Sequence, residues 1–193
     1  MDVAGRLTRR FSPTYPTPST REVSDTPCRC ASRTASAHNG SGIAVRRWGR
    51  VPRHRVRRRR IARFVALDAD TESLKEVDRA YGPYGVETVA APFSALITNR
   101  VQLGEFDLIY STGLFDYLSN NTGRRLVSTL FGMLKPGGQL VVANFMPGIR
   151  DVGYMEAFMD WKLVYRTRHS MVDLTMEIEE SEIHDMTVFA EES

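Results

Sequence analysis

Residues 63–70 read RFVALDAD, and the fold prediction starts from this stretch. Residues 63–68 are a short apolar run of the kind that forms a strand covered on both faces of a parallel sheet, and the run ends in an acid, Asp68. The next residues, 71–81, carry apolar side chains at helical spacing, and Gly82 can end that helix. A buried strand followed at once by an amphipathic helix predicts one unit of an α/β sheet.

The same alternation continues toward the C-terminus. Further strands are predicted at residues 86–93, 106–113, 139–145 and 186–192. Further helices are predicted at residues 122–134 and 154–166, and a tight turn at residues 135–138, which read KPGG. Strands that alternate with helices predict a parallel sheet with helices on both faces. Such sheets bind ligands beyond the carboxyl ends of their strands, so the residues that follow each strand are the candidates for a site.

Charge divides the chain near residue 60. Residues 1–60 contain fifteen Arg, no Lys and three acids, a net charge of +12, whereas residues 61–193 carry a net charge of −9. Residues 1–60 are rich in Pro, Ser, Thr and Arg and show neither helical nor strand periodicity. We therefore expect a disordered basic segment over residues 1–60 and an α/β domain over residues 61–193, because the first segment can bury too little apolar surface to fold.

Three interpretations of the basic segment are open. Its arginines could bind phosphate backbones as a nucleic-acid arm, or it could be an organellar transit peptide. It could also have no selected role, since no aromatic platform for stacking bases accompanies the charge. Cys28 and Cys30 are too few for a structural zinc site, and no apolar run approaches the ~20 residues of a membrane span. We expect a cytoplasmic protein without a membrane span.

Asp68 is the most informative candidate for a binding site. An acid at this place in a nucleotide-binding sheet can accept hydrogen bonds from both hydroxyls of a ribose. The alternative is that it begins the following helix, but Asp70 is better placed for that role.

The other predicted cofactor-site residues also follow strands. Small side chains at 111–113 would let a cofactor approach the backbone, whereas Leu114 and Phe115 are expected in the core. Phe93 could lie against an adenine ring, or it could simply pack in the interior. The predicted cofactor contacts beside Asp68 are Ala69, Phe93, Ser94, Ser111, Thr112 and Gly113.

Three motifs in order carry a resemblance to a known family. They are FVALDAD (64–70), FDLIYSTGLFDYL (106–118) and LKPGGQLVVANF (134–145). Together they resemble the class I S-adenosylmethionine-dependent methyltransferases over roughly residues 61–168. Residues 143–166 further resemble the bacterial subgroup that includes the enzymes making 3-hydroxypalmitic acid methyl ester. The resemblance implies a Rossmann-like sheet and S-adenosylmethionine as the cofactor.

The family's first motif, a strand followed by a glycine-rich loop, should lie 20–25 residues before the ribose acid. Gly40-Ser41-Gly42 is the nearest match, but no apolar strand precedes it. We therefore predict a sheet that lacks a proper first strand, with its central position unfilled. The composition of residues 1–60 is that of a gene read out of frame or from a wrong start, so we expect that they are not the native N-terminus of the domain.

The resemblance implies methyl transfer to a small-molecule acceptor, such as a carboxylate or a hydroxy fatty acid. A carboxylate acceptor is already anionic near neutral pH, so it needs no general base. This suits a sequence in which no catalytic dyad stands out and in which His169 and His184 are expected on the surface. The predicted acceptor contacts are Asn144, Tyr154, Asp160 and Tyr165. No catalytic residue and no metal site is assigned, and the oligomeric state is not predicted.

Three hypotheses remain open from the sequence. The first is a methyltransferase fold whose cofactor site is incomplete at the glycine loop, so that the chain is weak or inactive. The second is an active enzyme in which Gly40–Gly42 supplies the loop. The third is a nucleic-acid-binding protein that uses the arginine-rich arm beside a degenerate enzyme domain.

Overall fold

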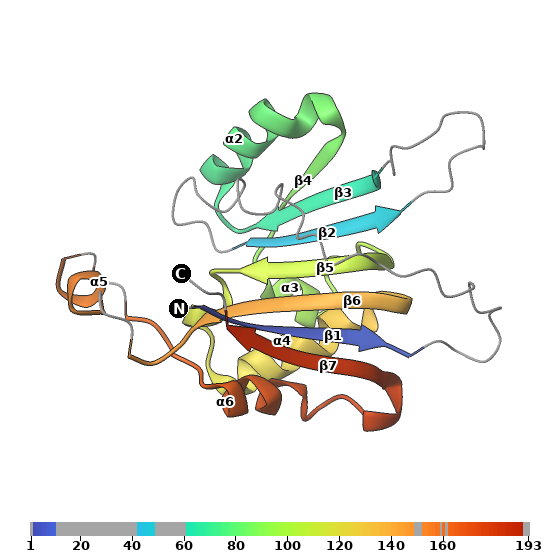
Figure 1. Cartoon of the computed structure of the whole chain (residues 1–193). Helices are drawn as coiled ribbons and strands as arrows, with labels where there is room; N and C mark the ends of the chain where they lie inside the picture. Colours follow the sequence, from blue (N-terminus) through green and yellow to red (C-terminus); the bar gives the residue numbers. More distant parts are fainter. Residues whose placement is uncertain are drawn as a thin grey trace.

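The computed structural model of the chain describes residues 2–10, 42–48, 61–148, 152–158, 160 and 162–190. Within these residues, seven strands form one sheet in the order β4-β3-β2-β5-β6-β1-β7 (Figure 1). The strands are β1 (Asp2–Arg9), β2 (Gly42–Trp48), β3 (Ile61–Asp68), β4 (Val86–Ala90), β5 (Phe106–Thr112), β6 (Leu134–Phe145) and β7 (Ile183–Ala190). The α-helices are α2 (Thr71–Tyr81), α3 (Ser94–Ile97), α4 (Asn120–Gly132), α5 (Val152–Phe158) and α6 (Arg168–Val172). Short 3₁₀ helices are η1 (Gly82–Tyr84), η2 (Phe115–Tyr117), η3 (Asp173–Thr175) and η4 (Glu180–Glu182).

The strand directions give a mixed sheet. Strand β3 is parallel to β4, and β5 is parallel to β6. Strand β2 lies between β3 and β5 and is antiparallel to both, and β1 is likewise antiparallel to both β6 and β7. Two strands therefore run against the other five. The prediction of a parallel sheet is therefore wrong for β1 and β2, whereas the central sheet with surrounding helices confirms the predicted α/β fold class.

Two of the strands come from the basic segment, for which no secondary structure was expected. That expectation is wrong for β1 and β2, whereas residues 11–41 and 49–60 lie outside the described residues. Both strands pair along both of their edges, so the sheet satisfies their backbone N–H and C=O groups. Local periodicity misses such strands because their partners are distant in sequence. The division into a segment 1–60 and a domain 61–193 remains a prediction.

The central position of the sheet, predicted to be unfilled, is occupied by β2. The physical reason is that the inner edges of β3 and β5 would otherwise leave two rows of backbone groups unpaired. An antiparallel strand satisfies these groups as well as a parallel one does. What the described residues do not contain is a parallel strand at this position followed by a glycine loop and a helix.

The main core lies on one face of the sheet. Its sheet residues alternate with half-buried ones along β3, β5, β6 and β1, and they are Val65, Leu67, Ile109, Leu140, Val142 and Leu7. Helices α3 and α4 lie behind the sheet in Figure 1, and they add Leu96, Leu126 and Leu130 to the core, while α6 adds Met171. Helix α2 packs apart from this cluster over β3 and β4, with Leu74 as its buried residue.

Two predicted elements differ from the observed ones. The KPGG stretch lies within β6, which begins at Leu134, and the pairing register with β5 shifts there, between Phe106 and Leu108. Gly137 has the left-handed backbone, φ +78°, that the predicted turn requires, but the chain continues as a strand. The helix predicted at residues 154–166 is wrong beyond Phe158, since residues 162–167 are not helical. Asp160 has a left-handed backbone with φ +49°, a conformation that does not continue a helix.

Candidate functional site

The carboxyl ends of β3, β4, β5 and β6 meet at one edge of the sheet, at the left of Figure 1. Because β2 runs the other way, its first residue lies at this same edge. Gly42 pairs with Thr112 of β5, and Ile43 pairs with Leu67 of β3, so Gly42 is level with Asp68. The edge therefore brings together the acid that ends β3, the start of β2 and the end of β5.

Asp68 lies half-buried at this edge, where the sequence placed it. Its Oδ1 accepts a hydrogen bond of 2.9 Å from the backbone N–H of Asp70, which holds the turn into α2. Its backbone oxygen accepts the N–H of Ala91, which ties β3 to the loop after β4. Among the described residues, the second carboxylate oxygen, Oδ2, has no hydrogen-bond partner. Ala69 is exposed beside it.

Asp70 begins helix α2, as predicted. Its side chain accepts the N–H of Glu72 at 3.0 Å and the hydroxyl of Ser73 at 2.6 Å. The Ser73 hydroxyl, followed by the Glu72 N–H, lowers the pKa of Asp70 below its usual value because both stabilise the charged form. Asp70 is thus the helix cap, which leaves Asp68 available for another role.

The loop after β5 is built from small residues at the same edge. Ser111 is buried, Thr112 is exposed, and Gly113 has a left-handed backbone with φ +77° that favours glycine. Leu114 and Phe115 are buried, which confirms that they belong to the core.

Phe93 and Ser94 stand at the start of α3, after β4. Phe93 is half-buried and packs against the main core, while Ser94 is exposed and its backbone oxygen accepts the hydroxyl of Thr98. The packing interpretation of Phe93 therefore has direct support, and its contact with an adenine ring stays a prediction.

Asn144 ends up inside the protein. Its Nδ2 group donates to the carbonyl oxygens of Val164 at 2.8 Å and Phe145 at 3.1 Å, and its Oδ1 accepts from Arg166 at 2.5 Å. Since the side chain is buried and both donor hydrogens are used, its observed role is to fasten residues 164–166 to the end of β6. A contact between Asn144 and an acceptor remains a prediction.

Arg166 is a residue that the sequence interpretation missed. It is almost completely buried, and its guanidinium donates to the carbonyl oxygens of Phe115 and Leu118 as well as to Asn144. Burial lowers the pKa of Arg166, and the nearby carboxylate of Asp116 acts in the opposite direction. No periodic pattern marks a buried arginine in a non-helical segment, so the sequence gives no signal for it.

The other predicted acceptor contacts are spread over the segment after β6. Tyr154 is 60% exposed on α5 and stacks on Phe158, with ring centroids 5.3 Å apart. Asp160 is exposed and pairs with Lys162 at 3.4 Å. The hydroxyl of Tyr165 is shielded from solvent, and burial, followed by the charges of nearby carboxylates, raises its pKa.

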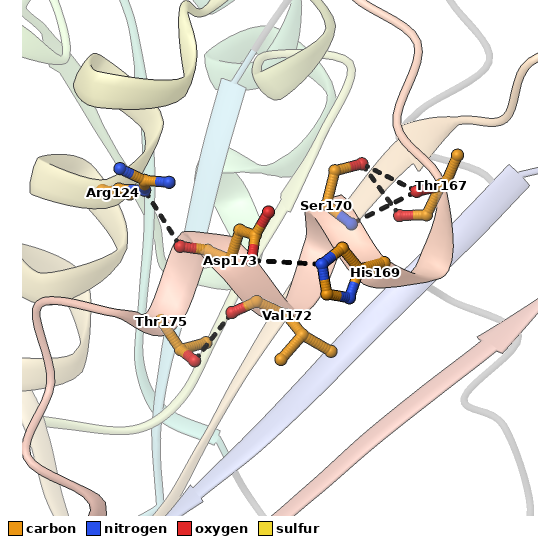
Figure 2. A network of polar contacts seen from close by, with 7 residues as sticks. All are labelled: Arg124, Thr167, His169, Ser170, Val172, Asp173 and Thr175. Atoms are coloured by element: carbon orange, nitrogen blue, oxygen red, sulfur yellow. Dashed lines mark hydrogen bonds and ion pairs between the residues drawn. The ribbon is translucent and has the colours of Figure 1, made fainter.

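Helix α6 carries a polar network, shown in Figure 2. Thr167 caps the helix by accepting the N–H of Ser170, and Arg124 of α4 donates to the backbone oxygen of Asp173. His169 Nε2 lies 3.9 Å from Asp173 Oδ1, but His169 is 89% exposed, and His184 is exposed as well. The predicted surface positions of both histidines are therefore confirmed. The contacts of the network cap helix α6 and join its C-terminal end to α4.

Within the described parts of the chain, no group of three or more His, Cys, Asp or Glu side chains is arranged to hold a metal ion. Over the same residues, no helix is both long and apolar enough to cross a bilayer. Cys28, Cys30 and the arginine run at 57–60 lie outside the described residues, so the predicted nucleic-acid arm remains a prediction.

The sheet and its carboxyl edge define a Rossmann-like α/β protein. The family model described as "Methyltransferase domain" matches residues 40–142, just over half of the chain. The chain belongs to this methyltransferase family. The match begins at Gly40 and so includes β2, Asp68 and the loop after β5, and it ends in β6 before Asn144. A search of curated proteins found no match to the chain.

Proposed function

We propose that this protein binds S-adenosylmethionine at the carboxyl edge of the sheet and transfers its methyl group to a small-molecule acceptor. Membership of the methyltransferase family supports the reaction class. The observation that carries the proposal is the position of the Asp68 carboxylate, at the end of β3 and level with the Gly42–Thr112 pair.

The residues at this edge fit the adenosine half of the cofactor. Asp68 Oδ1 already holds the N–H of Asp70, so Oδ2 is the oxygen that can accept the ribose hydroxyls. Gly42 has no side chain, and Gly113 adopts a backbone that glycine favours, so both allow a ligand to approach the main chain. The predicted contacts of Ala69, Ser94, Ser111 and Thr112 belong to this proposal.

The fit to the methionine half is poorer. The family's first motif aims a glycine loop and the N-terminus of a helix at this half, and β2 instead enters the edge from the opposite direction. At this edge, the backbone at Gly42 lies beside Thr112, where the loop after β5 begins. We therefore propose that contacts to the adenosine half supply most of the free energy of cofactor binding. This proposal agrees with the first hypothesis from the sequence, a methyltransferase whose incomplete cofactor site makes it a weak enzyme.

When bound, S-adenosylmethionine supplies an electrophilic methyl group, and the acceptor supplies the attacking electron pair. The residues of the edge orient the two and exclude water. A carboxylate or a hydroxy fatty acid is the acceptor class that we propose, on the strength of the subgroup resemblance. The exposed aromatic pair of α5, Tyr154 and Phe158, gives this side of the edge an apolar surface, and Figure 1 shows α5 beyond the carboxyl ends of the strands.

Titration calorimetry with S-adenosylmethionine and S-adenosylhomocysteine tests the proposal. Asp68→Asn keeps an oxygen for the N–H of Asp70 but removes the charge that a ribose would meet. We expect roughly tenfold to hundredfold weaker binding, the worth of hydrogen bonds to a charged group. Glu105→Gln is the matched control, because it removes an exposed carboxylate just before β5, at the opposite edge of the sheet.

Unchanged affinity in Asp68→Asn would reject the ribose role, and no binding by the wild-type chain would reject the proposed function. Release of S-adenosylhomocysteine in the presence of 3-hydroxy fatty acids of different lengths then tests the acceptor class. A chain that binds the cofactor but transfers nothing to these acceptors would exclude them as substrates.

A further inference from the structure

We propose that Arg166 is a positioning residue that holds the two walls of the site in one arrangement. The first wall is the cofactor-side loop, residues 113–118, which follows β5. The second is the acceptor-side segment, residues 162–167, which follows α5. The effect of this arrangement on ligand binding rests on the proposed function, whereas the mechanical link between the two walls does not.

The guanidinium of Arg166 reaches across to the cofactor-side loop. Nη1 donates to the carbonyl oxygen of Phe115 at 2.5 Å, and Nη2 donates to that of Leu118 at 2.6 Å. A weaker contact of 3.4 Å joins Nη2 to Oδ1 of Asn120, at the start of α4. The planar fork of an arginine therefore binds both ends of one short turn, which a single-point donor such as lysine cannot do.

Arg166, Asn144 and Asp116 form one buried polar cluster, the Arg166 junction, which also fixes the acceptor-side segment to the end of β6. The backbone N–H of Arg166 donates to the carbonyl oxygen of Phe145 at 2.9 Å, and Nδ2 of Asn144 donates to the carbonyl oxygen of Val164 at 2.8 Å. Asn144 Oδ1 in turn accepts a hydrogen bond from Arg166 Nη1. The side chain of Arg166, which belongs to the acceptor-side segment, therefore binds both Asn144 and the cofactor-side loop.

Asp116 connects the two walls a second time. Its carboxylate accepts the N–H of Phe145 at 2.8 Å, and its backbone oxygen accepts the N–H of Val164 at 2.6 Å. Asp116 is itself buried in the cofactor-side loop, between Phe115 and Leu118. The hydrogen bonds that Arg166 and Asp116 make to residues 115, 118, 145 and 164 thus join the two walls to each other or to the end of β6.

Loss of a hydrogen bond in the Arg166 junction should cost more free energy than loss of one at the surface, because the three side chains are buried. Arg166 is 1% exposed, Asn144 2% and Asp116 3%. Removing the guanidinium takes a donor away from the carbonyl oxygen of Leu118 and from the amide oxygen of Asn144 in the buried interior. The carbonyl oxygen of Phe115 also loses a donor and keeps only the N–H of Leu118. Helix α5, which precedes the acceptor-side segment, has Met155 as its buried residue and so gives that segment little other anchorage.

Hydrogen–deuterium exchange on the intact chain tests the link without any ligand. In Arg166→Lys, we expect the amides of residues 114–118 and of residues 164–166 to lose protection together, by about tenfold or more. Amides in the middle of β5 and α4 should keep wild-type protection, which separates local opening from general unfolding. Arg168→Met, an exposed arginine two residues away, is the matched control.

Binding of S-adenosylhomocysteine gives the second readout, measured well below the unfolding temperature. Dissociation constants should rise in the order wild type, Arg166→Lys, Arg166→Met, because lysine can replace part of the fork. Loss of protection in only one wall, or in neither, would overturn the proposed link. Joint loss of protection with an unchanged dissociation constant would reject the positioning role and leave a structural one. If the wild-type chain binds no S-adenosylhomocysteine, the proposed function fails, and the exchange data still decide the link.

Discussion

At the scale of single residues, neighbouring polar side chains at the carboxyl edge have different roles, because each makes different hydrogen bonds. Asp70 caps helix α2 with its side chain, whereas only one carboxylate oxygen of Asp68 accepts a hydrogen bond from the backbone. Asn144 lies at the end of a buried strand just as Asp68 does, yet it is enclosed, and both hydrogens of its amide group are donated. Position after a strand therefore places a residue at the edge, and the surrounding contacts decide whether it can meet a ligand.

The cap of α2 leads to a pH prediction. Because the folded state lowers the pKa of Asp70 below its ordinary value of 3.8, its charge stabilises the fold above that pH. This stabilisation is lost as the pH falls through the lowered folded-state pKa. Asp70→Asn keeps an oxygen for the N–H of Glu72 and removes the charge, so it should lower the unfolding temperature at neutral pH, with the difference shrinking below about pH 4.

Thermal unfolding followed by circular dichroism across this pH range is the measurement. Asp78→Asn on the same helix is the control for a change of net charge, because Asp78 is exposed and lies far from the cap. A difference between wild type and Asp70→Asn that stays constant from neutral to strongly acidic pH would contradict the assigned role.

At the scale of elements, α4 shows how a helix is adapted to what packs against it. A Cβ added to Gly123 would lie 2.9 Å from Leu174 and 3.6 Å from the guanidinium of Arg166. Gly132, at the other end of the same helix, has open space around it. A side chain at position 123 would therefore press against Leu174, whereas one at position 132 would meet no neighbour.

Alanine at these two positions should have opposite effects on the free energy of unfolding. Gly123→Ala should destabilise the protein by about 1–3 kcal/mol, because overpacking outweighs the better helix propensity. Gly132→Ala should be neutral or stabilise it by up to about 1 kcal/mol. Urea denaturation of both variants measures the difference, and equal effects would show that Leu174 gives way without cost.

At the scale of the whole molecule, the sheet depends on two strands from the arginine-rich part of the chain. Strand β1 is the partner through which β7 joins the sheet, and β2 joins the β3–β4 half to the β5–β6 half. The inner positions of the sheet are filled irrespective of strand direction, since unpaired backbone groups there would be costly.

Leu7→Ala tests whether β1 belongs to the folded core. Leu7 is 4% exposed and is part of the main core, so its truncation should cost about 2–5 kcal/mol of unfolding free energy. Thr8→Ala, the next residue on the same strand, is the control and should cost much less, because Thr8 is only half-buried. A chain whose first residues were disordered would be equally stable in both variants and in the wild type, as measured by urea denaturation.

Much of the fold could be predicted because local pattern and burial agree in residues 61–145. The strand ending at Asp68, the helix capped by Asp70 and the core positions of Leu114 and Phe115 all follow from the spacing of apolar residues and from cap chemistry. The helix expected up to residue 166 failed because aromatic spacing continued while the backbone turned at Asp160. Local periodicity cannot detect a segment that is held by side chains from elsewhere.

The sequence by itself determined which strands have buried faces and that Asp68 stands at a strand end, because these follow from the order of apolar and polar residues along a short stretch. Only the tertiary structure decided that β2 fills the centre of the sheet in the antiparallel direction and that Arg166 fastens the loop after β5 to the segment after α5. Both depend on hydrogen bonds between residues far apart in the chain, and the free energy of such pairings comes from groups that no local window of sequence contains.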